Sequence, residues 1–131
     1  MSIINNNNVI LAVTGARIFT DYKKFETLLL QYLKEYHEDK LPIKIIAGGA
    51  VGADKSAKKF ANERKIDFIE LKPQYHLFKH NPKIAPLVRN KDIVDAATHI
   101  VAFPMEKSSG TYHAISYAKQ KNKPIIVYKI E

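Results

Sequence analysis

Three glycines, Gly48, Gly49 and Gly52, lie within five residues and separate an apolar run, 43–47, from a helix-like run that begins near Ala53. Glycine lets the backbone turn tightly and lets another group approach the main chain closely. When such a turn joins a strand to a helix, its amide N–H groups and the positive end of the helix dipole face the space beyond the sheet. The segment therefore predicts a nucleotide-type anion site, although it matches neither the phosphate-binding loop nor the dinucleotide fingerprint.

Small, hydroxyl-bearing and cationic residues also form the turns after the first and fourth apolar runs of the chain. They are Thr14, Gly15, Ala16 and Arg17 in the first turn and Ser108, Ser109, Gly110 and Thr111 at the end of the second. The guanidinium of Arg17 can hold a phosphate or carboxylate through two parallel hydrogen bonds, and an ordinary surface arginine is the alternative. Hydroxyls and free N–H groups before the last helix form a second anion cradle, and helix capping is compatible with that role.

Two charged residues on predicted helices complete the candidate ligand contacts. Asp54 stands in the first turn of a helix, where a negative charge favours the helix dipole with or without a ligand. Because this charge would repel a phosphate, we expect Asp54 to accept hydrogen bonds from ribose hydroxyls or a base, with capping as the alternative. Arg89, followed by Asn90, is a second candidate cation, and a local ion pair with Asp92 three residues later is the alternative.

Apolar periodicities predict the elements that must position these residues. Strands are expected at 9–13, 43–47, 66–71, 99–103 and 124–128, and helices from a cap at Asp21 to Tyr36 and at 53–64, 87–97 and 110–121. Strands that alternate with helices pair in parallel through right-handed crossovers, so the expected fold is an α/β three-layer sandwich with a mainly parallel five-stranded sheet. Ligands bind such sheets beyond the carboxyl ends of the strands, where the strand order reverses, so the three turns are expected to meet at one edge.

Residues 72–86 break this alternation. Prolines, aromatic residues and basic residues alternate there without a helix or strand period, which predicts a loop or lid. His76 and His80 have the spacing of two metal ligands on one helix face, but no carboxylate or third histidine accompanies them at matching spacing, so we expect no metal site. No histidine and acid accompany Ser108 or Ser109 in a recognisable motif, so we expect no catalytic serine.

Length and composition set further bounds. A chain of 131 residues that is 46% hydrophobic predicts a single domain, assigned to residues 9–131, after a frayed asparagine-rich tail at 1–8. Zero cysteines exclude disulfides and thiolate metal sites. No apolar stretch approaches the roughly 18 residues that span a bilayer, and the first residues do not resemble a secretory signal, so we expect a cytoplasmic protein with no membrane partner.

The formal net charge of +8 favours an anionic partner, and nucleic acid, nucleotide phosphates and an acidic protein all qualify. Many of the lysines occur in pairs on predicted helices, where a solvated helix face is the ordinary explanation. Charge alone therefore does not choose among these partners.

Taken in order, the motifs of the three turns and of the Arg89-Asn90 pair resemble the SLOG superfamily, specifically its YspA-like branch, over about residues 9–128. The resemblance implies a Rossmann-like domain that binds a nucleotide or nucleotide-derived molecule, such as a cyclic ADP-ribose isomer, and needs no cofactor. It further implies a sensor or a sequestering protein, as in phage–host defence signalling. The ligand-binding residues that it implies are Thr14, Gly15, Ala16, Arg17, Gly48, Gly49, Gly52, Asp54, Arg89, Asn90, Ser108, Ser109, Gly110 and Thr111.

The same motifs are similar to those of the LONELY GUY phosphoribohydrolases, which use an arginine near the start of one helix and a glutamate three residues after a Gly-Thr pair. Arg89 resembles that arginine, but Ala114 stands where the glutamate is expected. Ribosidic cleavage needs a carboxylate to stabilise oxocarbenium character or to activate water. We therefore expect binding without a catalytic residue, with hydrolysis as the less favoured alternative.

The glycine segment also resembles the DNA-processing protein A family, which implies single-stranded nucleic acid as an alternative partner. Tyr75, Phe78, Lys79 and His80 combine aromatic rings for base stacking with positive charge, and the same loop suits a lid over a small ligand. The chain is shorter than those DNA-binding proteins, which carry extra domains. The resemblance and the aromatic-rich helices also lead us to expect a homo-oligomer of unstated size.

Overall fold

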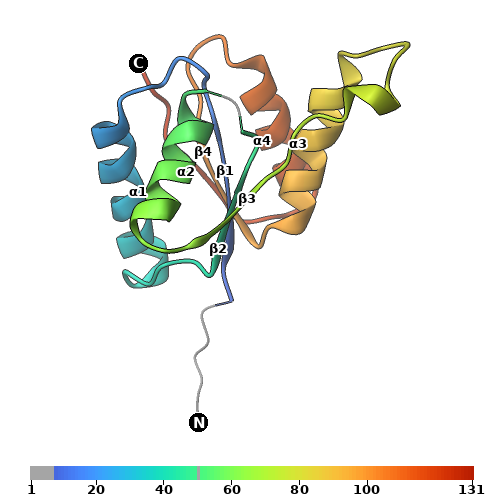
Figure 1. Ribbon diagram of the computed structural model, residues 1–131. Coiled ribbons are helices and arrows are strands. Elements are labelled where there is room, and N and C mark those ends of the chain that lie inside the picture. Colours follow the sequence, from blue (N-terminus) through green and yellow to red (C-terminus); the bar gives the residue numbers. More distant parts are fainter. Residues whose placement is uncertain (1–7, 50) are drawn as a thin grey trace.

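The computed structural model describes residues 8–49 and 51–131 (Figure 1). Most of the predicted tail, residues 1–7, and Ala50 of the glycine turn therefore lie outside the described residues. The elements are β1 (Ile10–Gly15), α1 (Tyr22–His37), β2 (Lys44–Ala47), α2 (Ala53–Glu63), β3 (Asp67–Glu70), the 3-10 turn η1 (Tyr75–Leu77), α3 (Ile84–Ala96), β4 (His99–Phe103), α4 (Ser109–Gln120) and β5 (Ile125–Val127).

The strands form one sheet in the order β3-β2-β1-β4-β5, and every neighbouring pair is parallel. The predicted α/β fold with a Rossmann-like sheet is thus confirmed, and the described sheet is parallel throughout. From β1 the chain proceeds outward through β2 to β3. It then returns to β4, on the other side of β1, and continues outward to β5. The order therefore reverses at the β1/β4 pair, whose carboxyl ends meet where Gly15 is in register with Phe103.

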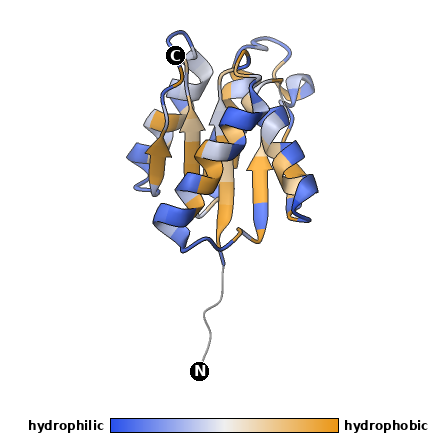
Figure 2. Ribbon diagram, turned by 90° about the vertical axis from the view of Figure 1, so that its left-hand side faces the viewer, coloured by the Kyte–Doolittle hydropathy of each residue, from blue (hydrophilic) through white to orange (hydrophobic). Residues whose placement is uncertain are grey.

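Alternate residues of each strand face opposite layers of helices, as a strand period of two requires. Leu11 and Val13 pack with the core beneath α1 and α2, whereas Ala12 packs with the core beneath α3 and α4. The strands are apolar on both faces and the outer helix surfaces are hydrophilic (Figure 2). This pattern buries the central strands β1, β2 and β4 between two helical layers, whereas the outer strands β3 and β5 are only partly buried.

The core beneath α1 and α2 is aromatic. The Phe25 ring lies 4.9 Å from the Phe103 ring, and both also contact Phe19, whereas Phe60 from α2 meets Phe25 edge-on. The core beneath α3 and α4 is built from smaller aliphatic side chains such as Val94. The larger rings fix the β1–α1 turn, which carries Phe19, against the end of β4.

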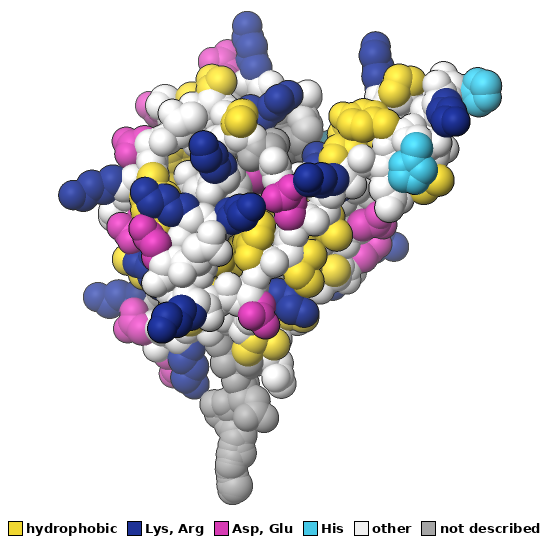
Figure 3. Space-filling model, viewed as in Figure 1, with side chains coloured by type: hydrophobic (Ala, Val, Ile, Leu, Met, Phe, Trp, Pro, Cys, Tyr) yellow, Lys and Arg dark blue, Asp and Glu magenta, His cyan; other side chains and the backbone are white. Residues whose placement is uncertain are grey.

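The element boundaries agree with the sequence predictions except around residues 72–86. Helix α3 begins at Ile84 rather than at Leu87. Pro86 lies in the first helical turn, where backbone N–H groups have no intrahelical acceptor, so its missing N–H costs no hydrogen bond. Within the predicted loop, Tyr75–Leu77 form a 3-10 turn. This segment stands away from the body as an arm, here defined as residues 72–83, that carries histidine, lysine and hydrophobic side chains (Figures 1 and 3). The helix cap predicted at Asp21 is confirmed by a hydrogen bond from the backbone N–H of Lys24 at 3.1 Å.

Candidate functional site

The β2–α2 turn brings Gly48 against two charged side chains from different helices. A β-carbon placed on Gly48 would lie 2.8 Å from Nη1 of Arg89, on α3, and 3.0 Å from Oδ2 of Asp54, on α2. Both side chains thus occupy the space that the absence of a side chain at position 48 provides. Asp54 is buried and stands at the second position of its helix, where the helix dipole favours its charge.

The guanidinium of Arg89 is held by the backbone of the sheet edge. Its Nη1 donates to the carbonyl oxygens of Gly48, at 2.9 Å, and Leu71, at 3.2 Å, and its Nε donates to Oδ1 of Asn90 at 3.0 Å. Among the described residues, none accepts a hydrogen bond from Nη2. Burial lowers the pKa of Arg89 and the negative charge of Asp54 opposes that shift, so the group stays a cation at neutral pH.

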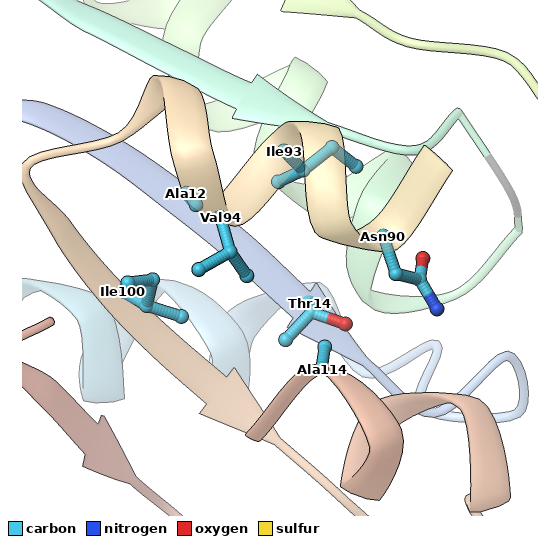
Figure 4. Close-up of a pocket in the computed structure, with 7 residues that line it drawn as sticks. All are labelled: Ala12, Thr14, Asn90, Ile93, Val94, Ile100 and Ala114. Atoms are coloured by element: carbon cyan, nitrogen blue, oxygen red, sulfur yellow. The ribbon is translucent and has the colours of Figure 1, made fainter. Parts of the chain in front are cut away.

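Asn90 links this cation to the start of α4. While its Oδ1 accepts from Arg89, its Nδ2 donates to the carbonyl oxygen of Gly110 at 3.4 Å. In Figure 4 the polar ends of Asn90 and Thr14 lie at the same end of a hollow whose other walls are apolar. The hollow has a volume of about 10 Å³, which is room for one water molecule and not for any part of a nucleotide. The hollow itself is therefore not a nucleotide site.

Ala114 forms part of the wall of this hollow and is buried. It comes from α4 and lies next to Thr14 (Figure 4). Position 114, where the phosphoribohydrolases carry a glutamate, thus holds a methyl group that closes the interior beneath the edge. The described site has no carboxylate at this point.

The start of α4 differs from a helix with a side-chain cap. Ser108 is the cap residue, but its Oγ accepts from the backbone N–H of Met105 at 3.0 Å and so closes the preceding turn instead. Thr111 is buried in the first turn, whereas Ser109 and Gly110 are exposed. Helix α4 therefore begins beside Asn90 without a capping side chain, and the N–H group of Ser109 donates to the carbonyl oxygen of Lys107 at 3.0 Å.

The sequence analysis did not select Glu70, although it lies in the site. It ends β3, and a β-carbon on Gly49, whose φ is +77°, would clash with its side chain. Its carboxylate also faces the ammonium groups of Lys58, at 4.0 Å, and Lys72, at 3.6 Å. The sequence signal for Glu70 is its place as an acidic residue near the carboxyl end of the strand predicted at 66–71.

Arg17 meets the glycine turn through its backbone. A β-carbon on Gly52 would clash with the carbonyl oxygens of Ala16 and Arg17, and Gly15 likewise packs directly on Ala53. The Arg17 side chain is exposed to solvent. The close approach that Gly48, Gly49 and Gly52 allow is thus made by the protein's own groups, which lock the turns together at the switch point.

The predicted site residues therefore fall into four sets. Gly48, Asp54, Arg89, Asn90 and Gly110 are joined by direct contacts. Gly15, Ala16, Gly49 and Gly52 pack the turns. Thr14 lines the hollow, and Thr111 is buried in the first turn of α4. Arg17, Ser108 and Ser109 border the edge without a side-chain contact to the first set among the described residues. The local ion pair between Arg89 and Asp92 is not formed, since the guanidinium turns to the sheet edge instead.

A groove with a volume of about 130 Å³ opens beside Arg89, between the end of β3, the arm and α3. Its lining residues are Leu71, Lys72, Gln74, Phe78, Ala85, Val88, Arg89 and Asp92. The described residues hold no group of three or more histidine and acidic side chains placed to bind a metal ion. None of their helices is both long and apolar enough to cross a bilayer.

Two known proteins are similar to this chain over most of its length. The Gene 61 protein of Mycobacterium phage D29 is 28% identical over 117 residues, which cover 87% of this chain and 91% of that protein. The fold is similar to DNA processing protein A from Helicobacter pylori, a protein whose structure was described for its single-stranded DNA binding mode, with a TM-score of 0.63 and 23% identity. That likeness covers 92% of this chain, which spans only 65% of the solved chain.

A family model also matches residues 9–78, which contain β1, the glycine turn and the start of the arm. The matched segment is more than half of the 131 residues. The chain belongs to the YspA, cpYpsA-related SLOG family.

Proposed function

We propose that this protein binds a nucleotide or a nucleotide-derived small molecule at the carboxyl edge of its sheet. The observation that carries the proposal is the fixed cation. Arg89 is half-buried, is oriented by the carbonyl groups of Gly48 and Leu71, and keeps Nη2 without an acceptor among the described residues. A guanidinium held in this way loses little conformational entropy when it binds a phosphate.

The groups around Arg89 suit the different parts of a nucleotide. The N–H groups at the start of α4 and the guanidinium favour a phosphate, and Asn90 connects the two. Asp54 suits a ribose, because a carboxylate has about four lone-pair sites and accepts further hydroxyl donors beside its existing contacts. The combination of one fixed cation with nearby acids is better suited to one nucleotide unit than to a long polyphosphate chain.

Binding without efficient catalysis is the form of the proposal that the site supports best. Ala114 is buried, and its methyl group leaves no carboxylate to stabilise an oxocarbenium-like transition state there. A phosphoribohydrolase remains the alternative enzyme function. Long incubation with nucleoside monophosphates followed by chromatography tests it, and release of free base that depends on Arg89 would establish hydrolysis.

A sensor or a sequestering protein in phage–host defence is the biological role we propose for such binding. Three observations support this role. The described residues form one binding domain around a single sheet, Ala114 replaces the glutamate expected of a hydrolase, and the chain is similar to a phage protein. An ADP-ribose-type second messenger, including its cyclic isomers, is the proposed ligand class. Lowering of the free messenger concentration in a mixture with the purified protein, measured after filtration, tests sequestration.

Single-stranded nucleic acid is the second candidate partner, and the charge of one segment favours it. Residues 71–91 contain five lysine or arginine residues and no aspartate or glutamate. On the face in Figure 3, however, lysine and arginine side chains are spread over the surface and mixed with acids rather than gathered in one stripe. A mobility shift with a single-stranded oligonucleotide at physiological salt tests this function, since generic attraction weakens steeply with salt.

Thermal unfolding in the presence of AMP, ADP, ADP-ribose and its cyclic isomers is the main test. A ligand that binds only the folded state raises the melting temperature by mass action. We expect a shift for the wild type that Arg89→Ala abolishes. Lys40→Ala is the matched control, because it removes one charge from the α1–β2 connection at the opposite edge of the sheet. Equal shifts in both variants would refute the proposed site.

A homo-oligomer remains a prediction. Helix α1 exposes the apolar side chains of Leu30, at 40%, and Tyr36, at 52%, and contact with a second copy would bury such side chains. Sedimentation equilibrium measures the number of copies directly. A protein that stays monomeric at micromolar concentration would remove this prediction and leave the binding proposal intact.

A further inference from the structure

The groove beside Arg89 has the size and lining of a subsite for one flat ring system. Its volume is about 130 Å³, well below the roughly 300 Å³ at which pockets begin to enclose whole drug-sized ligands. Leu71, Phe78, Ala85 and Val88 make its apolar walls, and Phe78 is half-buried there. An open slot of this size and polarity accommodates one heterocyclic ring but not a complete nucleotide.

We propose that this groove receives the base of the bound nucleotide and that Phe78 and Asp92 recognise it; the inference rests on the proposed function. The phenyl ring of Phe78 offers a face or an edge for base contact, and such contacts are tolerant of base identity. Arg89 also lines the groove, so its planar guanidinium can contact the same ring.

Two polar residues of the groove select among bases. Asp92 lies one turn after Arg89 on α3, and an ionised carboxylate only accepts hydrogen bonds. Gln74, from the arm, both donates and accepts. This pair fits a base that presents an exocyclic amino group next to a ring nitrogen, as adenine and guanine do. A base that presents only carbonyl oxygens to Asp92 would leave two acceptors facing each other.

The order of groups along the sheet edge matches the order of groups in a nucleotide. The groove lies at the end of β3, Asp54 and Gly48 follow at β2, and Asn90 bridges to the start of α4 after β4. The neighbouring strands β3, β2, β1 and β4 therefore present a base site, a ribose acceptor and a phosphate site in sequence. Arg89 stands between the first and the last, in contact with both sides.

Calorimetric titration with AMP, GMP, inosine 5′-monophosphate, purine riboside 5′-monophosphate and ribose 5-phosphate tests the inference. We expect AMP to bind more tightly than purine riboside monophosphate and GMP more tightly than inosine monophosphate, because each second member lacks the amino group. Phe78→Ala should weaken AMP and GMP about tenfold or more and leave ribose 5-phosphate unchanged. Asp92→Asn should remove the preference for amino-bearing bases. Leu77→Ala is the control, because Leu77 is an exposed apolar residue of the arm that lies outside the groove lining.

The outcomes separate this inference from the proposed function. If ribose 5-phosphate and the nucleotides bind equally well and Phe78→Ala changes neither, the base lies elsewhere and the inference fails while the edge site stands. If no compound in the panel binds, and Arg89→Ala changes nothing, the proposed function fails with it. If Phe78→Ala unfolds the protein, Phe78→Leu replaces it, because leucine keeps most of the apolar volume but has no ring. Nucleotide affinities that are unchanged both in Phe78→Leu and in Asp92→Asn overturn the inference.

Discussion

The Nη1 atom of Arg89 donates to the carbonyl oxygen of Gly48 at 2.9 Å, a hydrogen bond between residues 41 positions apart in the chain. It ties helix α3 to the end of strand β2, and a second bond from the same atom to Leu71 ties it to the end of β3. One side chain thus holds together the carboxyl ends of two strands and presents its remaining donors at the edge. The structural role of Arg89 and its proposed ligand-binding role therefore have separable consequences.

Arg89→Ala should lower the free energy of unfolding by about 1–3 kcal/mol, because it leaves backbone carbonyl groups without their charged donor. Arg89→Lys should recover part of the stability, since one ammonium can replace one donor, but it cannot reproduce the planar fork. Urea unfolding of both variants beside Lys40→Ala measures this. A fully stable Arg89→Ala protein would mean that the bonds to Gly48 and Leu71 contribute nothing.

Gly52→Ala should destabilise the protein by about 2 kcal/mol or more. Its φ of +79° is unfavourable for a residue with a side chain, and the new β-carbon would clash with the backbone of Ala16 and Arg17. Gly110→Ala is the matched control, because its β-carbon would make only an ordinary contact, 4.0 Å from Nδ2 of Asn90, and alanine favours helix by up to about 1 kcal/mol. Thermal denaturation that ranks the two variants the other way round would contradict this packing of the turns.

Ala114→Glu should cost about 2 kcal/mol or more, because a carboxylate would enter a hollow of about 10 Å³ among apolar side chains. Ser116→Glu adds the same residue at an exposed position of the same helix and should have little effect. Chemical denaturation compares them. Equal stability of the two variants would indicate that position 114 opens to the ligand edge, and the hydrolase alternative would regain support.

Two histidines at the opposite edge of the sheet predict a pH dependence of stability. The rings of His37 and His99 lie 4.8 Å apart, and Nε2 of His37 is 2.8 Å from the hydroxyl of Tyr32. Burial lowers the pKa of both histidines, and the charge of His99 adds to the lowering of the pKa of His37. Protonation therefore favours the unfolded chain.

The folded-state pKa of each histidine lies below the ordinary value of 6.5. The contribution of the two neutral histidines to the free energy of unfolding is therefore complete above about pH 6.5. It is lost as the pH falls through the folded-state pKa values. Urea unfolding between pH 7.5 and 5 should show this fall, and His37→Gln with His99→Gln should reduce its slope. His76→Gln, on the exposed arm, should not. An unchanged slope in the double variant would assign the pH dependence to other groups.

The sequence predicts the sheet well because its strands carry a strong and simple signal. The runs around Val13, Ile46 and Val101 are apolar on both faces, as buried parallel strands must be, and helices with one apolar stripe separate them. The predicted start of α3 was three residues too late because of Pro86. A proline near the start of a helix and a proline in a loop look alike in a single sequence.

The site is less predictable, since its contacts join residues distant in sequence. Arg89 and Asn90 could be selected by motif, but nothing in the sequence indicates that Arg89 would turn to Gly48 rather than to Asp92. Glu70 was missed for the same reason, because its contact with Gly49 depends on how two neighbouring strands end. The glycines of the β2–α2 turn allow close approach either of a ligand or of the protein's own groups, and the sequence does not distinguish the two. In the described turns the protein's own groups make this approach.

Backbone amide chemical-shift mapping by NMR during titration with ADP-ribose, AMP and GMP locates a bound ligand without assuming its site. We expect shifts that cluster at the sheet edge, at Gly48, Asp54, Asn90 and Gly110, and that disappear in Arg89→Ala. Shifts centred on the opposite edge, around Lys40 and His99, or a spectrum unchanged by all three ligands, would contradict the proposed site.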